Sequence, residues 1–330
     1  MDNPRDHHVV PQFFLRNFAI DEAHTKVTTL AKEGAVAVWM ERSIKSIGYE
    51  RDFYVHMQGN RPISVETNIN RTVETPISRS DTWAKIVAGR SADLDQTDRP
   101  ILYSLVRHLE ARTPHYLQTS AELAAMAADP SSEMEFTQDE WEMYTALRAN
   151  PALAKLMFNA MALRSFADDY DRSLIQVARS PIPLRSSTTP VLPAPAPAHA
   201  AMDLPLPGMV PFQRVLAVDP HTLIQVVVGD FDGAFVNGEM PIELAHGFNR
   251  SVAGQFAHFP KVRHMICGRD RLVEDMTWAP FELASDTPAK MIFKRRSAQA
   301  TVSEAPRLAF HSPRPVSPKM NKELRPEQSP

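Results

Sequence analysis

The sequence predicts an α+β fold, with a helix-rich core, a small N-terminal β-hairpin and a C-terminal β-containing segment. A β-branched run split by Lys-Glu-Gly over residues 26–40 is typical of a hairpin. Apolar residues then recur at helical spacing through most of residues 64–178, and strand-like runs return after residue 212. Because strands and helices are largely segregated along the chain, an α+β arrangement fits the sequence best.

The composition is that of an ordinary globular protein of 330 residues, 43% hydrophobic and 23% charged. The single cysteine, Cys267, excludes an internal disulfide and a zinc site built from several cysteines, and it fits a reducing compartment. No run approaches the roughly 18 apolar residues that span a bilayer, and we find no secretion signal. We therefore expect a cytoplasmic protein with no membrane partner. The net charge of −3 does not support specific nucleic acid binding.

Local patterns predict the first elements in order. In residues 6–18, DHHVVPQFFLRNF, Pro11 suits a first helical turn and phenylalanines follow at helical spacing, so we expect a short buried helix. The hairpin comes next. An amphipathic helix is then predicted near residues 64–78, where apolar residues lie four apart: Val65, Ile69, Val73 and Ile77.

Longer helices are predicted in the middle of the chain. Residues 97–128 open with an N-cap candidate and a proline, and we expect one long helix or two helices broken near Pro114. Residues 137–150 and 151–178 continue the helical pattern, and the second of these has no glycine and no internal proline.

The chain divides into four segments. Residues 1–180 are the helix-rich part of a single α+β domain. Residues 181–211 carry nine prolines and form a Pro-rich insertion or loop, because proline lacks the amide donor that regular structure needs. Residues 212–284 are the β-containing remainder, with two strands about an Asp-Pro-His turn, a helix and a strand. Residues 285–330 are dominated by Pro, Ser and charge, so we expect a disordered tail.

Two adjacent histidines, His7 and His8, are the first candidate catalytic residues. They precede a helix N-terminus, whose partial positive charge favours a neutral imidazole able to bind a metal or accept a proton. In the alternative, structural role, one imidazole hydrogen-bonds the backbone to fix the N-terminus and the other faces water. The sequence leaves both roles open.

A second set of candidates lies on the helix that follows. Glu66, Asn70 and Glu74 are four apart and share one face. About 12 Å of helical rise separates the two carboxylates, so they do not readily bind one small ion together. One of them is expected to join His7 or His8, with Asn70 beside it; the alternative is an exposed or interface stripe.

Arg112 is the candidate anion-binding residue. It lies four residues after His108, so the two share a face of the long helix. A guanidinium there either binds a carboxylate or phosphate ligand bidentately, or forms an internal ion pair with Glu66, Glu74 or Asp52.

Other motifs narrow the functional classes. The sequence has no Walker lysine loop, GxGxxG, GxSxG or HExxH, which removes the commonest nucleotide-binding, hydrolase and zincin classes. The opening DHHVVP is similar to the start of HNH-type nucleases, although few residues precede it and no matching Asn and His pattern follows. His264 and Cys267 lie three apart on a predicted strand and so face opposite sides, which disfavours a metal site there.

Several motifs occur in a family-like order: HHVVPQFFLRNF at residues 7–18, KSIGYERDFY ending at Tyr54, Glu66 and Glu74, RTP from Arg112, SSTTPV at residues 186–191, and the helix containing Asn249. In these features the chain resembles an uncharacterised, mainly bacterial family, domain of unknown function 4238, over about residues 6–270. The resemblance implies a layout and no activity. At the position of SSTTPV in this chain, the family has a pattern similar to Thr-Ser-Asp-Asn-Pro-Val. Thr188 and Thr189 therefore stand where the family has an acid and an amide.

We expect a protein with a polar site. If it is an enzyme, the first class is a hydrolase of an anionic substrate, with His7 or His8 as base or metal ligand, Glu66 orienting the imidazole and Arg112 binding the anion. Asn70, Glu74 and Thr188 complete the expected ligand-binding set, and a divalent metal is the candidate cofactor. The alternatives are a non-catalytic interaction or ligand-binding protein with structural histidines, whose partner is a small anion or a protein, and an HNH-like metal-dependent nuclease.

Overall fold

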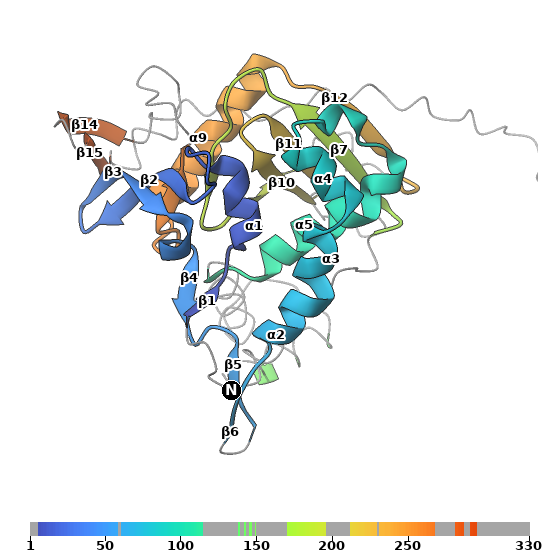
Figure 1. The fold of residues 1–330 in the computed structure, drawn as a ribbon, viewed down its shortest axis with the longest axis horizontal. Coiled ribbons are helices and arrows are strands. Elements are labelled where there is room, and N and C mark those ends of the chain that lie inside the picture. The colour runs from blue at the N-terminus through green and yellow to red at the C-terminus, as the bar shows by residue number, and fades with distance from the viewer. Residues whose placement is uncertain are drawn as a thin grey trace, which may run out of the picture.

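The computed structural model describes most of the chain, with gaps. The described residues are 6–58, 61–114, 170–195, 212–229, 231–267, 281–286 and 291–295, with a few helical positions between 138 and 149. Helices and two main sheets are both present, so the predicted α+β class is confirmed (Figure 1).

A six-stranded antiparallel sheet is built around the predicted N-terminal hairpin. Its order is β14 (Phe281–Asp286), β15 (Met291–Arg295), β3 (Val36–Ser43), β2 (Lys26–Glu33), β13 (His264–Ile266) and β8 (Ser186–Ser187). The β2–β3 hairpin lies at the centre of this sheet and is its longest pairing, running from Lys26 opposite Ser43 to Glu33 opposite Val36. Residues 27–31 of β2 are all buried, including Thr28 and Thr29, so both faces of this central strand are covered.

A five-stranded sheet forms the other main layer. Its order is β12 (Phe235–Glu239), β7 (Ser173–Arg179), β11 (Thr222–Val228), β10 (Phe212–Asp219) and β9 (Val191–Pro195). Only the β12–β7 pair is parallel. The predicted strands about the Asp-Pro-His turn are β10 and β11, and the turn brings Asp219 and His221 to one end of this sheet.

Helices cover the sheets and close one hydrophobic core. They are α1 (Gln12–Leu15) with a 3-10 turn (Arg16–Phe18), α2 (Glu66–Ile69), α3 (Thr75–Ser78), α4 (Asp81–Val87), α5 (Arg99–Ala111) and α9 (Ile242–His258). In Figure 1, α3, α4 and α5 lie on the β7 side of the molecule and α9 lies near β2 and β3. Side chains from both sheets and from these helices belong to a single buried cluster. None of the helices in the described part is both long and apolar enough to cross a membrane.

The predicted amphipathic helix is interrupted by a π-helical segment. Between α2 and α3 the chain forms a π turn over Asn70–Glu74. Pro76 follows at once and lacks the amide that an α-helix would use, so the backbone departs from the regular pattern here. The π turn changes which side chains share a face, so the strict four-residue spacing of Glu66, Asn70 and Glu74 no longer describes their arrangement.

Short strand pairs and 3-10 turns connect these layers. β1 (Asp6–His8) pairs with β4 (Tyr49–Arg51), and β5 (Val55–Gln58) pairs with β6 (Arg61–Ser64). Further 3-10 turns span Ile44–Ser46, Ser91–Asp93 and Gln96–Asp98.

The opening motif is held down by a close backbone approach. The amides of Val9 and Val10 both donate to the carbonyl of Gly48, at 2.8 and 3.0 Å. Gly48 has φ +66°, and a Cβ there would lie 2.9 Å from Val10 Cβ. Glycine is therefore required at this crossing.

The structure corrects three boundaries. Ser173–Arg179, predicted as the end of a helix, is strand β7, whose Ile175 and Val177 are buried between neighbours on both sides. The segment predicted as a Pro-rich loop over residues 181–211 contains the strands β8 and β9, both at sheet edges. An edge strand tolerates proline because it pairs on one side alone, so a missing backbone amide removes few hydrogen bonds. The tail predicted from residue 285 still contains β15, which pairs with β3 and includes the half-buried Ile292. Residues 287–290 and 296–330 of that tail lie outside the described part, as do 196–211 of the predicted loop and 115–137 and 151–169 of the helix-rich part.

Candidate functional site

The structure brings His7, Glu66, Glu74, His108 and Arg112 into one buried polar cluster. Nε2 of His7 lies 3.7 Å from Oε2 of Glu66. Arg112 forms an ion pair with Glu74, and its Nη1 lies 2.7 Å from Nε2 of His108. His7, His108 and Arg112 are at most 1% exposed. Residues from β1, the α2–α3 helix and the end of α5 therefore meet at one point.

Arg112 is fully engaged within the protein. Its Nε donates to the hydroxyl of Tyr54 at 2.8 Å, its Nη1 to Glu74 and its Nη2 to the carbonyl of His8. Each of the three guanidinium nitrogens thus has a protein acceptor. Of the two alternatives that the sequence left open, this is the internal ion pair, and the guanidinium connects β1, the chain after β4 and the π turn.

His7 is held in one tautomer. Its Nδ1 accepts a hydrogen bond from the backbone amide of Tyr54 at 2.8 Å, so the ring proton sits on Nε2, facing Glu66. The ring also stacks on Tyr54, with centroids 5.6 Å apart. One ring nitrogen is therefore used to fix the backbone, as the structural alternative expects. The neighbouring His8 is partly exposed, and its Nε2 lies 3.1 Å from the side-chain amide nitrogen, Nε2, of Gln12.

Burial and charge set the ionisation of the cluster. Burial alone would raise the pKa of Glu74, but Arg112 and His108 outweigh it and lower the pKa from 4.5 to about 2. Burial raises the pKa of Glu66, against the opposing effects of His7 and Arg112. Burial also raises the pKa of Tyr54, so its hydroxyl keeps its proton. The cluster contains an ion pair and neutral donors at neutral pH.

Asn70 and Thr188 lie apart from these contacts. Asn70 is exposed on the π turn. Thr188 is buried at 6% exposure, and its hydroxyl accepts from the amides of Arg263 at 3.1 Å and His264 at 3.4 Å. Thr188 thus belongs with β13 and not with the histidine pair. Within the described residues, no group of three or more His, Cys, Asp or Glu side chains is arranged to hold a metal.

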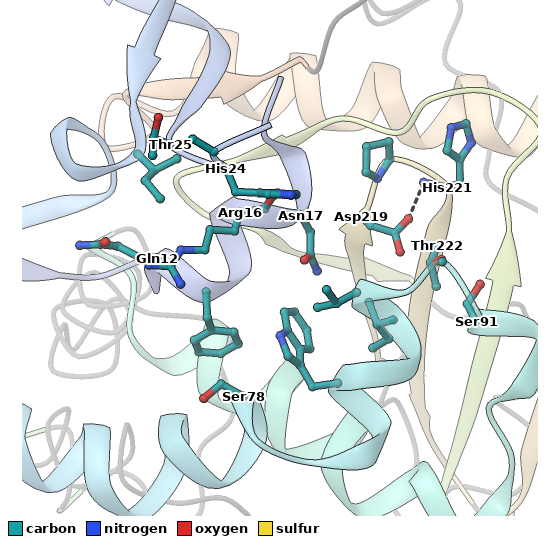
Figure 2. A pocket seen from close by; sticks show the side chains of 18 of the residues that line it. Gln12, Arg16, Asn17, His24, Thr25, Ser78, Ser91, Asp219, His221 and Thr222 are labelled. Carbon is teal, nitrogen blue, oxygen red and sulfur yellow. Dashed lines mark hydrogen bonds between the residues drawn. The ribbon is translucent and has the colours of Figure 1, made fainter. Parts of the chain in front are cut away.

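A cavity of about 890 Å³ lies on the other side of the opening motif. Gln12, Arg16 and Asn17 line it, while Phe14, Leu15 and Phe18 of the same segment are buried in the core. Asn17 is fixed by donating to the carbonyl of Val218 at 2.9 Å. Figure 2 shows Arg16 and Gln12 on one side of the cavity and Asp219, His221 and Thr222 on the other.

The charged side chains that line this cavity are mostly positive, and we call it the basic cavity. Arg16 and Lys45 are exposed, and among the described residues neither has an ion-pair partner. Arg179 also lines the cavity but is held by Glu239 at 2.8 Å and Asn237 at 2.6 Å. Asp219, the single carboxylate among the described lining residues, accepts from the backbone amide of His221 at 2.6 Å. Burial raises the pKa of Asp219.

Aromatic side chains supply the apolar part of the lining. Trp83 of α4 is 4% exposed and meets Phe13 edge to face, with ring centroids 5.0 Å apart. Sequence patterns do not predict this site, because its residues come from α1, the 3-10 turn at Ile44–Ser46, α4 and the β10–β11 turn. The available signal was the interleaving of Gln12, Arg16 and Asn17 with buried aromatics in one short segment.

A family model described as a protein of unknown function (DUF4238) matches residues 6–228. The chain belongs to the DUF4238 family. This match confirms the resemblance inferred from the motifs, and it covers the buried cluster, the lining residues of the basic cavity and Thr188. No curated protein and no solved structure matches the chain. The description of the family gives no activity, so the function has to be inferred from the geometry of this chain.

Proposed function

We propose that the protein binds a small organic anion in the basic cavity. The observation that carries the proposal is that Arg16 and Lys45 both line the cavity while neither has an ion-pair partner among the described residues. An anionic ligand would supply the missing acceptors, and charge-assisted hydrogen bonds are the stronger kind. A small anionic ligand was also the common element of the enzyme and ligand-binding alternatives predicted from the sequence.

The size and apolar lining favour an anion that carries a ring. The volume of about 890 Å³ is within the range of roughly 300–1,000 Å³ typical of small-molecule sites. Trp83 and Phe13 offer aromatic surface, and Gln12 and Asn17 offer amide groups at the same cavity. We therefore favour a ligand with an acidic group near Arg16 and a flat apolar part near Trp83.

The test uses 1-anilinonaphthalene-8-sulfonate, a dye that combines a sulfonate with aromatic rings. In a fluorescence titration of the folded protein, Arg16→Gln and Lys45→Gln should each weaken binding about tenfold. Arg71→Gln, which removes an exposed arginine outside the cavity, is the matched control and should bind like the parent.

Energy transfer shows whether the dye is in this cavity. Energy transfer from tryptophan to the bound dye should fall clearly in Trp83→Phe, although the other three tryptophans of the chain remain. Parent-like affinity in the double variant Arg16→Gln, Lys45→Gln would overturn the proposal, provided that circular dichroism shows an unchanged melting curve.

Hydrolysis of an anionic substrate in the same cavity is the second candidate. It is favoured by Asp219, because a carboxyl group with a raised pKa in a basic cavity suits a general acid. Turnover of p-nitrophenyl phosphate that is lost in Asp219→Asn, with dye binding retained, would support it. A parent protein that binds the dye and turns over no p-nitrophenyl phosphate would favour binding alone.

The catalytic roles predicted for His7, His8 and Glu66, and the metal-dependent nuclease alternative, remain predictions. The geometry favours them less, because Nδ1 of His7 and all three nitrogens of Arg112 have partners inside the protein. A bacterial, cytoplasmic setting is likewise part of the proposal, and the buried thiol of the single cysteine, Cys267, fits a reducing compartment.

A further inference from the structure

A second, smaller cavity lies where β13 meets the chain around β4. Its volume is about 200 Å³, below the usual range for small-molecule sites of roughly 300–1,000 Å³. Arg42, Lys261, Arg263 and His264 line it, together with Thr188 and Glu50. It shares no lining residue with the basic cavity. We call it the β13 cavity.

Positive charge exceeds negative charge around the β13 cavity. Among the residues that the structure describes, Glu50 is the only carboxylate lining it, and it lies 3.1 Å from Arg263. Lys261 has no ion-pair partner among the described residues. Arg42 has a long ion pair of 3.8 Å with Glu33, whose side chain is 47% exposed, and its buried Nε has no hydrogen-bond partner. The positive charge of Lys261 and much of that of Arg42 are therefore not compensated by a carboxylate among the described residues.

Neutral donors face the same space. The Thr188 hydroxyl oxygen accepts from the amides of Arg263 and His264, so its own proton is left to donate. Nδ1 of His264 is buried and has no hydrogen-bond partner. Burial lowers the pKa of His264 to about 4, with Arg42 and Arg263 acting in the same direction, so the ring is neutral at pH 7 and carries one N–H.

We propose that the β13 cavity binds a compact tetrahedral oxyanion of the phosphate class, held by Arg42, Lys261 and the hydroxyl of Thr188. The cavity supplies what such an ion needs: cations whose charge is not compensated, and a threonine hydroxyl whose proton is left to donate. Its small volume selects a compact ion and excludes the larger organic anion assigned to the basic cavity. This site is independent of the function proposed above.

The experiment uses inorganic phosphate as the probe and isolates the β13 cavity. The parent for the titration carries Arg16→Gln and Lys45→Gln, so that the basic cavity does not contribute. Isothermal titration calorimetry should show one phosphate per chain, and the melting temperature should rise more with phosphate than with chloride at equal ionic strength. Glycerol 3-phosphate, tested alongside, distinguishes a free ion from the phosphate group of an ester.

Substitutions locate the binding. In that background Lys261→Gln and Arg42→Gln should each weaken phosphate binding about tenfold or more, while Arg71→Gln changes nothing. Thr188→Asp should abolish binding, because a carboxylate at this position would occupy the site as an internal anion. The imidazole resonance of His264, assigned with His264→Gln, should shift on phosphate addition.

Three results would overturn the proposal. They are an equal response to phosphate and chloride, parent-like phosphate affinity in Lys261→Gln, and phosphate binding that persists in a folded Thr188→Asp protein. Because Lys261 is exposed, its substitution tests binding without endangering the fold.

Discussion

The buried cluster around Arg112 and the basic cavity around Arg16 lie on either side of the same opening motif, yet they use charge in opposite ways. Arg112 is 1% exposed and each of its guanidinium nitrogens has a protein acceptor. Arg16 is exposed and, among the described residues, has no ion-pair partner. A buried cation needs partners to offset its lost hydration, whereas an exposed one keeps water and stays available. Burial and partners, more than residue type, separate the two roles.

The largest expected effect is on stability, from Arg112→Met. This change should lower the free energy of unfolding by about 3–5 kcal/mol, because it leaves Glu74 buried without its cation. Urea denaturation measures the loss. Arg16→Met is the matched control and should change stability by less than about 0.5 kcal/mol.

A double variant separates the ion pair from simple packing. Arg112→Met with Glu74→Leu removes both charges and should recover part of the loss, since no uncompensated charge remains. An Arg112→Met protein as stable as the parent would show that the cluster does not hold the fold together.

The next effect is a pH dependence from Glu74. Its pKa is about 2 in the folded protein and 4.5 for an ordinary glutamate. A lowered pKa means that the folded state stabilises the carboxylate, by about 3 kcal/mol at 1.36 kcal/mol per unit. This contribution is fully present above pH 4.5 and is lost as the pH falls towards 2.

Glu74→Gln should therefore be less stable than the parent at pH 7, by about 3 kcal/mol, and the difference should shrink between pH 4.5 and 2. Urea denaturation across this range measures it. Glu239→Gln is the control, because Glu239 is 73% exposed and pairs with Arg179 at the surface. A difference between Glu74→Gln and the parent that stays constant with pH would contradict the folded-state pKa.

The sequence predicted local features well and distant ones poorly. The hairpin, the helix after Pro11 and the strands about the Asp-Pro-His turn follow from periodicity within a few residues. The strand β7 was mistaken for helix because its run from Ser173 continues a pattern without breakers, and only pairing with β11 and β12 decides its state.

Site residues show the same limit. The meeting of His7 with Glu66 was proposed from their types, and the structure places them 3.7 Å apart. The π turn before Pro76 was not predicted, because hydrophobic spacing does not report a single wide turn. The basic cavity was not predicted either, since Arg16, Trp83 and Asp219 are brought together by tertiary packing alone.

The smallest expected effect comes from Asp219, the only carboxylate that lines the basic cavity in the described part of the chain. Burial raises its pKa above 3.8, so the folded state favours the protonated form and ionisation costs stability once the pH rises above that ordinary value. Asp219→Asn removes this cost while its amide oxygen still accepts from the backbone of His221. The variant should be more stable than the parent at pH 7, by less than about 1 kcal/mol, and the advantage should shrink as the pH falls to about 4, where the unfolded parent also begins to take up a proton. It should also bind the dye at least as tightly, because the net positive charge of the cavity increases. Melting curves at pH 4 and pH 7 measure the change in stability, and a dye titration measures the affinity. A variant that loses both stability and affinity at pH 7 would mean that partners hold Asp219 as a carboxylate, as they hold Glu74. The contrast between the buried cluster and the basic cavity would then fail at this residue.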